Sequence, residues 1–365
     1  MNQLIGKGFY IWKIPMCESG DPNAIADLAS RAGLSHVLIK IANGIYDYNY
    51  DSVAKKDLVK PVTLALKEKG IQVWGWHYVY GDLPEQEAQA AIRQIGKIPL
   101  DGYVIDAESE YKDKYTPCRI FLDELRKNLP DFPIALSSFR YPKYHPQLPW
   151  KDFLSGINLN MPQVYWEQTH NPGEQLRRCL SEFQSITPFR TIIPTGPAYA
   201  ANEWKPTSQD IIEFMNTAVQ LNFSAVNFYS WDYCRLNLPH IWDTISGFNW
   251  PYSLNLTKDI VELFIDAINI RNLDMIISLY HSNAAHITVQ STIQGIASIR
   301  TWYDLLINQS MANFHFETSA IESSQNSRHI HWKAVSNEGK IKSGIDTIGL
   351  LDGKIIYHYS SMIEK

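Results

Sequence analysis

The chain has 365 residues, of which 45% are hydrophobic and 12% aromatic, and its formal net charge at pH 7 is -5. This length exceeds that of a usual single domain, so we expect two domains. A slightly acidic chain without a cluster of Lys and Arg lacks the positive surface that nucleic acid or an anionic membrane would need, and we predict neither as a partner.

From Gly6 to about Trp250, apolar β-rich runs alternate with amphipathic helical stretches. The predicted strands are residues 8–14, 36–42, 72–80, 102–108, 133–138, 157–166, 191–195 and 225–231. The predicted helices are residues 23–32, 59–69, 84–98, 117–128, 173–186 and 208–221. Eight strands alternating with helices are typical of a (β/α)8 TIM barrel, which we predict for residues 1–250. A doubly wound open sheet is the alternative, but no glycine-rich phosphate loop follows the first strand.

The fourth predicted strand ends in three carboxylates at alternate positions, Asp106, Glu108 and Glu110. Because a strand repeats every two residues, the three side chains share one face, and the Cα atoms of Asp106 and Glu108 are about 6.6 Å apart. Two acids so close shift each other's pKa, and one tends to keep its proton at neutral pH. A glycosidase needs such a pair, because one carboxyl protonates the departing sugar oxygen while another group stabilises the charged ring. The alternative interpretation is a strand that ends in a solvated acidic loop.

TIM-barrel enzymes place their active sites at the C-terminal ends of the strands. The residues that we predict there as substrate contacts are Tyr10, Trp12, Trp76, His77, Tyr78, Glu110, Gln163, Tyr165, Trp231 and Asp232. Lys40, Asn43, Tyr80, Ser137, Ser138, Arg140, Tyr199 and Tyr229 also fall at or just beyond strand ends. Aromatic rings stack on the C–H faces of sugars and polar groups pair with hydroxyls, so an oligo- or polysaccharide is the predicted substrate. Core packing is the alternative role for each ring and for His77, and surface charge is the alternative for Asp232.

Several of these motifs resemble glycoside hydrolase barrels of the family 25 lysozyme and family 18 chitinase kind. The matching pieces are Gly75-Trp-His-Tyr-Val-Tyr80, Glu87-Ala-Gln-Ala90, Tyr103-Val-Ile-Asp-Ala-Glu108, Met161-Pro-Gln-Val-Tyr165 and Phe228-Tyr-Ser-Trp231. The resemblance covers residues 1 to about 235. It implies that Glu108 is the general acid/base, that Asp106 orients the substrate or stabilises charge, that Tyr165 lines the reacting sugar and that Trp231 forms the pocket floor.

One departure from family 25 concerns the first strand, where Tyr10 stands at the position of an acid. Three interpretations stay open. The substrate's own acetamido group attacks the anomeric carbon, as in family 18; or the specificity has moved to another glycan; or the barrel binds sugar without cutting it.

After Trp250 the alternation of strand and helix ends. Residues 257–280 and 296–307 have helical periodicity, and residues 286–289, 314–321, 329–335 and 341–359 have strand character, the last broken by the turn signal Asp352-Gly353. This order predicts an α+β domain with an antiparallel sheet over residues 256–365. With Trp332-Lys-Ala334, Gly344-Ile-Asp346 and Leu351-Asp-Gly-Lys-Ile355, it resembles the nuclear transport factor 2-like cone and its SnoaL-like relatives. The resemblance implies an apolar pocket containing Asp346, with small-molecule binding or homodimer formation as the role of this domain.

The four cysteines, Cys17, Cys118, Cys179 and Cys234, lie far apart and follow no metal-binding pattern. We therefore predict no disulfide framework, no metal site and no cofactor. The N-terminus lacks a basic start followed by an apolar run, and no stretch of about 18 apolar residues occurs. As given, the sequence predicts a cytoplasmic protein, or a secreted one if a leader was removed.

Overall fold

The computed structural model describes residues 4–251, 259–269, 271–324, 326–351 and 353–363. It divides into two compact units, Met1–Ser253 and Leu254–Lys365. No helix in these described ranges is long and apolar enough to cross a membrane.

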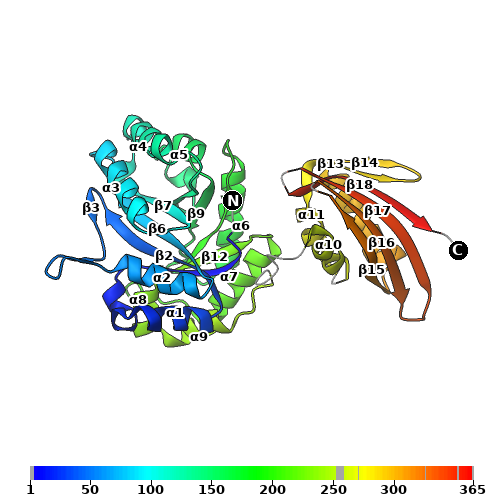
Figure 1. The fold of residues 1–365 in the computed structure, drawn as a ribbon, viewed down its shortest axis with the longest axis horizontal. Helices are drawn as coiled ribbons and strands as arrows, with labels where there is room; N and C mark the ends of the chain where they lie inside the picture. The colour runs from blue at the N-terminus through cyan, green and yellow to red at the C-terminus, as the bar shows by residue number, and fades with distance from the viewer. Residues whose placement is uncertain (1–3, 252–258, 270, 325, 352, 364–365) are drawn as a thin grey trace. The chain divides into compact units, whose positions relative to one another are not determined.

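The first unit is a closed barrel of eight parallel strands (Figure 1). The strands are β1 (Gly6–Ile11), β2 (Leu34–Asn43), β6 (Gln72–Val79), β7 (Gly102–Ala107), β8 (Ile134–Phe139), β9 (Leu159–Gln163), β11 (Thr195–Pro197) and β12 (Ala225–Tyr229). The sheet closes because β1 pairs in parallel with both β12 and β2. Short additions are β10 (Thr191–Ile192) beside β9, β3 (Tyr46–Asp47) beside β2, and the hairpin of β4 (Tyr50–Asp51) and β5 (Lys56–Asp57). The predicted closed α/β barrel is thus confirmed.

The helices of this unit are α1 (Pro22–Arg31), α2 (Val59–Glu68), α3 (Pro84–Lys97), α4 (Tyr115–Asn128), α5 (Trp150–Gly156), α6 (Pro172–Gln184), α7 (Ser208–Gln220), α8 (Trp231–Asn237) and α9 (Pro239–Gly247). Single 3-10 turns are η1 (Ile14–Met16), η2 (Glu18–Gly20), η3 (Ser109–Tyr111) and η4 (Pro142–Tyr144). Helix α1 begins at Asp21, whose carboxylate accepts hydrogen bonds from two backbone N–H groups of the first turn. Helix α7 begins with a capping box between Thr207 and Asp210. Helices α5, α8 and α9 were not predicted, because they are too short to show a clear helical period in the sequence.

The alternation along each strand separates two cores. On β7, Tyr103 and Ile105 belong to the core between the barrel and its helices. Val104 instead joins Trp74 and other side chains in the barrel interior. A residue with a side chain does not fit at Gly102, because its Cβ atom would approach the Trp74 ring to 2.5 Å. These interior side chains fill the barrel, so the inward positions at the C-terminal strand ends line a cavity with a closed bottom.

The second unit combines helices with one sheet. Its elements are α10 (Ile260–Asn269), α11 (Leu273–Ser278), β13 (Tyr280–Thr288), β14 (Thr292–Gln294), α12 (Ile296–Leu305), the π-helical turn η5 (Leu306–Ser310), β15 (Phe314–Ser323), β16 (Ser327–Ser336), β17 (Ile341–Leu351) and β18 (Lys354–Ile363). The strand order is β14-β13-β18-β17-β16-β15, and α10 and α12 pack against β15 and β13.

Two details of the second unit differ from the predictions. The expected purely antiparallel sheet is wrong at one position, because β13 and β18 pair in parallel. Four strands and the helix α12 separate these two in sequence, so their pairing is a long-range contact that local patterns do not encode. The predicted strand at residues 286–289 is the end of the longer β13. In the predicted turn, Asp352 lies outside the described residues.

Candidate functional site

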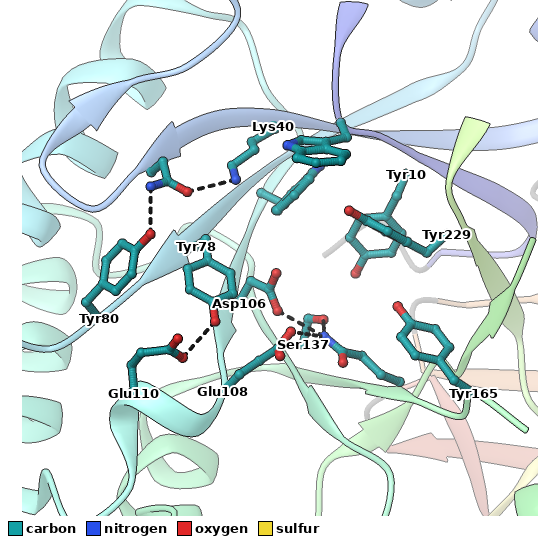
Figure 2. A pocket seen from close by; sticks show the side chains of 14 residues that line it. Tyr10, Lys40, Tyr78, Tyr80, Asp106, Glu108, Glu110, Ser137, Tyr165 and Tyr229 are labelled. Carbon is teal, nitrogen blue, oxygen red and sulfur yellow. Dashed lines mark hydrogen bonds between the residues drawn. The ribbon is translucent and has the colours of Figure 1, made fainter. Parts of the chain in front are cut away.

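A cavity of about 390 Å³ opens at the C-terminal ends of the barrel strands. Its lining, drawn in Figure 2, consists of Tyr10, Trp12, Lys40, Asn43, Trp76, Tyr78, Tyr80, Asp106, Glu108, Glu110, Ser137, Gln163, Tyr165 and Tyr229. Nine of the twelve barrel residues predicted as site residues are among them. The volume falls in the range of small-molecule sites. The lining combines aromatic rings with amides and carboxyls and is therefore more polar than the mostly apolar lining of a usual ligand pocket.

Asp106 and Glu108 lie side by side and share one hydrogen-bond donor. Gln163 Nε2 donates to Asp106 Oδ1 at 3.1 Å and to Glu108 Oε1 at 2.9 Å, and it lies 3.3 Å from Ser137 Oγ. Gln163 ends β9, whereas the two acids flank Ala107, the last residue of β7, and β8 lies between the two strands. One amide from a non-adjacent strand therefore fixes the relative orientation of the two carboxyls (Figure 2).

The surroundings of this pair favour protonation. Burial raises the pKa of Asp106 well above its usual range, and the charge of Glu108 raises it further, while Lys40 acts in the opposite direction. Burial also raises the pKa of Glu108, against the effect of the Gln163 amide and with that of Glu110. The pair therefore retains a proton at pH values where isolated carboxyls are ionised.

A single cation, Lys40, is present among the residues that line this cavity. Its Nζ donates to Asn43 Oδ1 at 2.8 Å and lies 4.5 Å from the ring centroid of Tyr48 and 4.7 Å from that of Trp76. Burial lowers the pKa of Lys40 to about 8, although the charge of Asp106 opposes this shift. At neutral pH the ammonium group stays mostly charged and partly balances the acids.

The wall across from the acids is made of tyrosines. Tyr10, Tyr165 and Tyr229 lie together on the right of Figure 2, with ring centroids 5.9 Å apart for Tyr10 and Tyr229 and 6.4 Å apart for Tyr165 and Tyr229. Burial raises the pKa of all three phenols, so they stay neutral. Neutral phenols donate and accept hydrogen bonds but carry no negative charge.

His77 does not line the cavity, which corrects its prediction as a substrate contact. It lies between Trp76 and Tyr78, both of which face the interior, so alternation turns His77 toward the helices. Its ring is fully buried, with Nδ1 2.8 Å from Tyr103 Oη and Nε2 2.7 Å from the Gly44 carbonyl oxygen. Burial lowers its pKa to about 4, so His77 is a neutral core residue.

Trp231 and Asp232 are also placed outside the cavity. Strand β12 ends at Tyr229 and the chain enters α8 at Trp231, so the inward alternation stops before both residues. Trp231 is fully buried, and its Nε1 donates to Glu18 Oε2 at 2.7 Å. Asp232 Oδ1 accepts a hydrogen bond from the Trp12 backbone N–H at 3.0 Å. Both residues support the loop after β1, and the predicted floor role of Trp231 is wrong.

Five lining residues were assigned to strand ends but not predicted as substrate contacts. They are Lys40, Asn43, Tyr80, Ser137 and Tyr229. The signal that identifies them is parity along the strand. Tyr80 continues the alternation of Trp76 and Tyr78, and Tyr229 lies two residues before the wrongly chosen Trp231.

The second unit has a cavity of its own, of about 670 Å³, and Asp346 is among its lining residues. Asp346 is buried and accepts hydrogen bonds from Trp332 Nε1 at 3.0 Å and from His358 Nε2 at 2.9 Å. Within the described ranges, no group of three or more His, Cys, Asp or Glu side chains is arranged to hold a metal ion. Cys17, Cys118, Cys179 and Cys234 are buried free thiols.

No protein-family model matches the sequence, and no curated protein is similar to it. Solved structures match a minor part of the chain. A SnoaL-like protein of unknown function from Burkholderia thailandensis is 17% identical over 28% of this chain and 92% of that chain, with a TM-score of 0.26. An NTF2-like protein of unknown function from Burkholderia xenovorans is 15% identical over 29% and 81%, also with a TM-score of 0.26. A de novo designed protein with a curved β-sheet is 13% identical over 28% and 82%, at 0.26. Likenesses this remote assign no activity to either unit.

Proposed function

We propose that the barrel is a glycoside hydrolase that cleaves a β-linked glycan containing N-acetylated amino sugars, with Glu108 as general acid/base and Asp106 as its partner. The observation that carries this proposal is the pair of carboxyls held by the Gln163 amide at the mouth of the barrel. A general acid must be protonated at neutral pH. Burial raises the pKa of both groups, the charge of Glu108 raises that of Asp106 further, and the charge of Glu110 raises that of Glu108.

The position of the acids suggests which group attacks the sugar. Glycosidases that use two carboxylates place them on opposite sides of the scissile bond. Here the three acids of the cavity, Asp106, Glu108 and Glu110, all come from the end of β7 and the turn that follows it. The wall across from them consists of neutral tyrosines. We therefore propose that the acetamido oxygen of the substrate attacks its own anomeric carbon.

In this reaction Glu108 gives its proton to the leaving oxygen as the glycosidic C–O bond breaks. The acetamido oxygen forms a bond to the anomeric carbon, and Asp106 accepts a hydrogen bond from the acetamido N–H, which gains positive charge. A water molecule then attacks the same carbon and reopens the ring of the intermediate, and Glu108 takes the proton of that water. Glu108 is therefore protonated again at the end of the cycle.

The rings of the cavity supply the binding surface. Trp12 and Trp76 belong to the lining, as do five tyrosines, and flat rings pack against the C–H faces of sugars. Lys40 and Asn43 add polar groups that reach substrate hydroxyls. The combination fits an uncharged, hydroxyl-rich ligand better than a lipid or a nucleotide.

A second candidate is a barrel that binds a saccharide without cutting it. The observation in its favour is Tyr10, which stands in the first strand where resembling enzymes carry an acid. The binding surface would then be the same, and only turnover distinguishes the two functions.

The test is release of reducing ends from peptidoglycan, chitin oligomers and neutral β-glucans by wild type, Glu108→Gln and Glu68→Gln. Glu68 is an exposed acid of α2 and serves as the matched control. We expect wild type and Glu68→Gln to release sugar, and Glu108→Gln to be slower by roughly two to four orders of magnitude. Saccharide binding by all three proteins without turnover would establish the binding function instead.

For the second unit we propose a nuclear transport factor 2-like fold, which serves either ligand binding or dimer formation. Its support is the arrangement of helices against one six-stranded sheet around a cavity that contains Asp346. Light scattering of the full chain tests a homodimer: a mass of twice 41.9 kDa would support dimer formation, and a monomer would leave ligand binding as the role.

A further inference from the structure

We propose that a groove beside the barrel cavity is a second glycan-binding site, which holds sugar units of the same chain at a distance from the cleaved bond. This proposal rests on the hydrolase function proposed above and adds that chains too long for the cavity alone are the preferred substrate. The groove has a volume of about 780 Å³ and is lined by residues of two loops. Its side chains include Gln168, His170, Asn202, Glu203, Trp204 and Lys205.

The groove lies on the same face of the barrel as the cavity. One of its loops, residues 164–171, follows β9, and the other, residues 198–207, follows β11, so both begin at the C-terminal ends of neighbouring strands. The first loop also carries Tyr165 of the cavity lining. Tyr199, whose ring contacts that of Tyr165, donates a hydrogen bond to the Glu167 carboxylate and so joins the two loops next to the cavity. A glycan chain that extends from the cavity across these loops reaches the groove.

Two aromatic rings form the base of the groove. Trp204 is 9% exposed, and its Nε1 donates to the Thr169 carbonyl oxygen at 2.8 Å. The His170 ring lies beside the Trp204 ring, with centroids 6.2 Å apart and an angle of 29° between the planes. His170 Nδ1 is 2.7 Å from an oxygen of the buried Asp210 carboxylate, which holds the imidazole in place. Because both rings are fixed before binding, they offer the C–H face of a sugar a surface at little ordering cost.

The polar side chains of the groove suit a neutral ligand that is rich in hydroxyls. Gln168 and Asn202 are exposed amides, and each offers both donors and an acceptor to sugar hydroxyls. Apart from His170, the charged side chains among the described lining residues are Glu203 and Lys205, whose charges cancel. This lining therefore lacks the concentration of positive charge that would attract a phosphate or a nucleic acid. An uncharged glycan fits it better.

Chitin oligomers of two to eight sugar units test this site through chain length. Gln168 and Asn202 both have a left-handed backbone, with φ of 63° and 54°, so the double variant Gln168→Gly/Asn202→Gly removes both amides without backbone strain. We expect it to lower kcat/KM about tenfold for the longest oligomers and to leave kcat/KM unchanged for the shortest, which occupy only the cavity. The matched control is Asn222→Gly, because Asn222 has a φ of 58° and lies just beyond the C-terminal end of α7, away from the groove. This control should change neither value.

Binding to the Glu108→Gln variant, measured by isothermal titration calorimetry, separates this proposal from hydrolysis. In that background the two glycine substitutions should weaken binding of the longest oligomers about tenfold and leave that of the shortest unchanged. If wild type releases no sugar but this pattern is observed, the hydrolase function is wrong and the groove remains a glycan-binding site. The groove proposal is wrong if the glycine substitutions affect short and long oligomers equally or not at all. It is also wrong if affinity does not rise with chain length, or if no oligomer binds.

Discussion

The amide of Gln163 donates to both acids of the barrel cavity, so its removal should raise the pKa of this carboxyl pair. Gln163→Leu keeps the approximate size of the side chain but deletes the N–H donor 3.1 Å from Asp106 and 2.9 Å from Glu108. A hydrogen bond to a charged acceptor contributes about 1.5–3 kcal/mol. About 1.36 kcal/mol corresponds to one pKa unit, so the apparent pKa of the pair should rise by about one to two units.

The sign follows from which form the amide stabilises. The Gln163 donor favours the ionised carboxyls and lowers the pKa of both, so its loss favours the protonated forms. Both limbs of the pH profile of kcat/KM should therefore move to higher pH. Infrared difference spectra of the protonated-carboxyl C=O band, recorded against pH, measure the same shift without any turnover.

Gln175→Leu is the matched control. Gln175 is a buried glutamine of α6 whose Nε2 donates to Thr169 and Asn171, outside the cavity. This variant should leave the pH profile and the C=O titration unchanged. If Gln163→Leu also leaves them unchanged, or moves them to lower pH, the Gln163 amide does not lower the pKa of the carboxyl pair.

Three further predictions concern residues around the site. Trp12, partly exposed at the cavity, should bind sugar without taking part in the chemistry, so Trp12→Ala should raise KM about fivefold at unchanged kcat. Tyr46→Ala, which removes an exposed ring outside the cavity, should change neither constant. A fall in kcat alone in Trp12→Ala would contradict this prediction. Because burial raises the pKa of Asp106, the folded protein loses stability as pH rises through that pKa. Asp106→Asn should therefore stabilise the protein by about 1–2 kcal/mol at pH 8 and by less at pH 4. An equal gain at both pH values in thermal melts would refute this prediction. Burial lowers the pKa of His77 to about 4, so up to about 3 kcal/mol of folding stability is lost as pH falls from about 6.5 toward 4. His77→Gln should reduce the dependence of stability on pH in this range. An unchanged pH dependence of the unfolding free energy, measured by denaturant titration, would contradict this prediction.

The features that the sequence predicted well depend on local periodicity. The alternation of strands and helices indicates a barrel. The two-residue repeat places Asp106 on the inward face of β7 and directs Glu108, one residue beyond the strand, into the same cavity. The same rule, applied at every position, excludes His77, which has the wrong parity between Trp76 and Tyr78. Local rules are reliable here because each strand is held in one register by neighbours on both sides.

The features that were missed depend on where elements end and on contacts between distant segments. Trp231 has the right parity, but β12 ends two residues earlier, and no turn residue such as Gly or Pro signals this. The hydrogen bonds of Gln163 to two acids more than fifty residues away require the closed barrel. The parallel pairing of β13 with β18 likewise depends on how the second unit folds as a whole.

The tyrosine at position 10 gives the proposed mechanism a direct test. Tyr10 lies on the wall across from the acids, and its raised pKa keeps the phenol neutral, so it can hold a substrate oxygen but cannot act as a carboxylate. Attack by water from that side would need a general base there, and the acids of the lining are all on the side of β7. In the proposed mechanism the nucleophile therefore comes from the substrate. Chitin oligomers should be cleaved, and their de-N-acetylated counterparts of equal length should be slower by about two orders of magnitude or more, because they lack the attacking oxygen. Equal kcat/KM for the two would show that a protein group or water performs the attack.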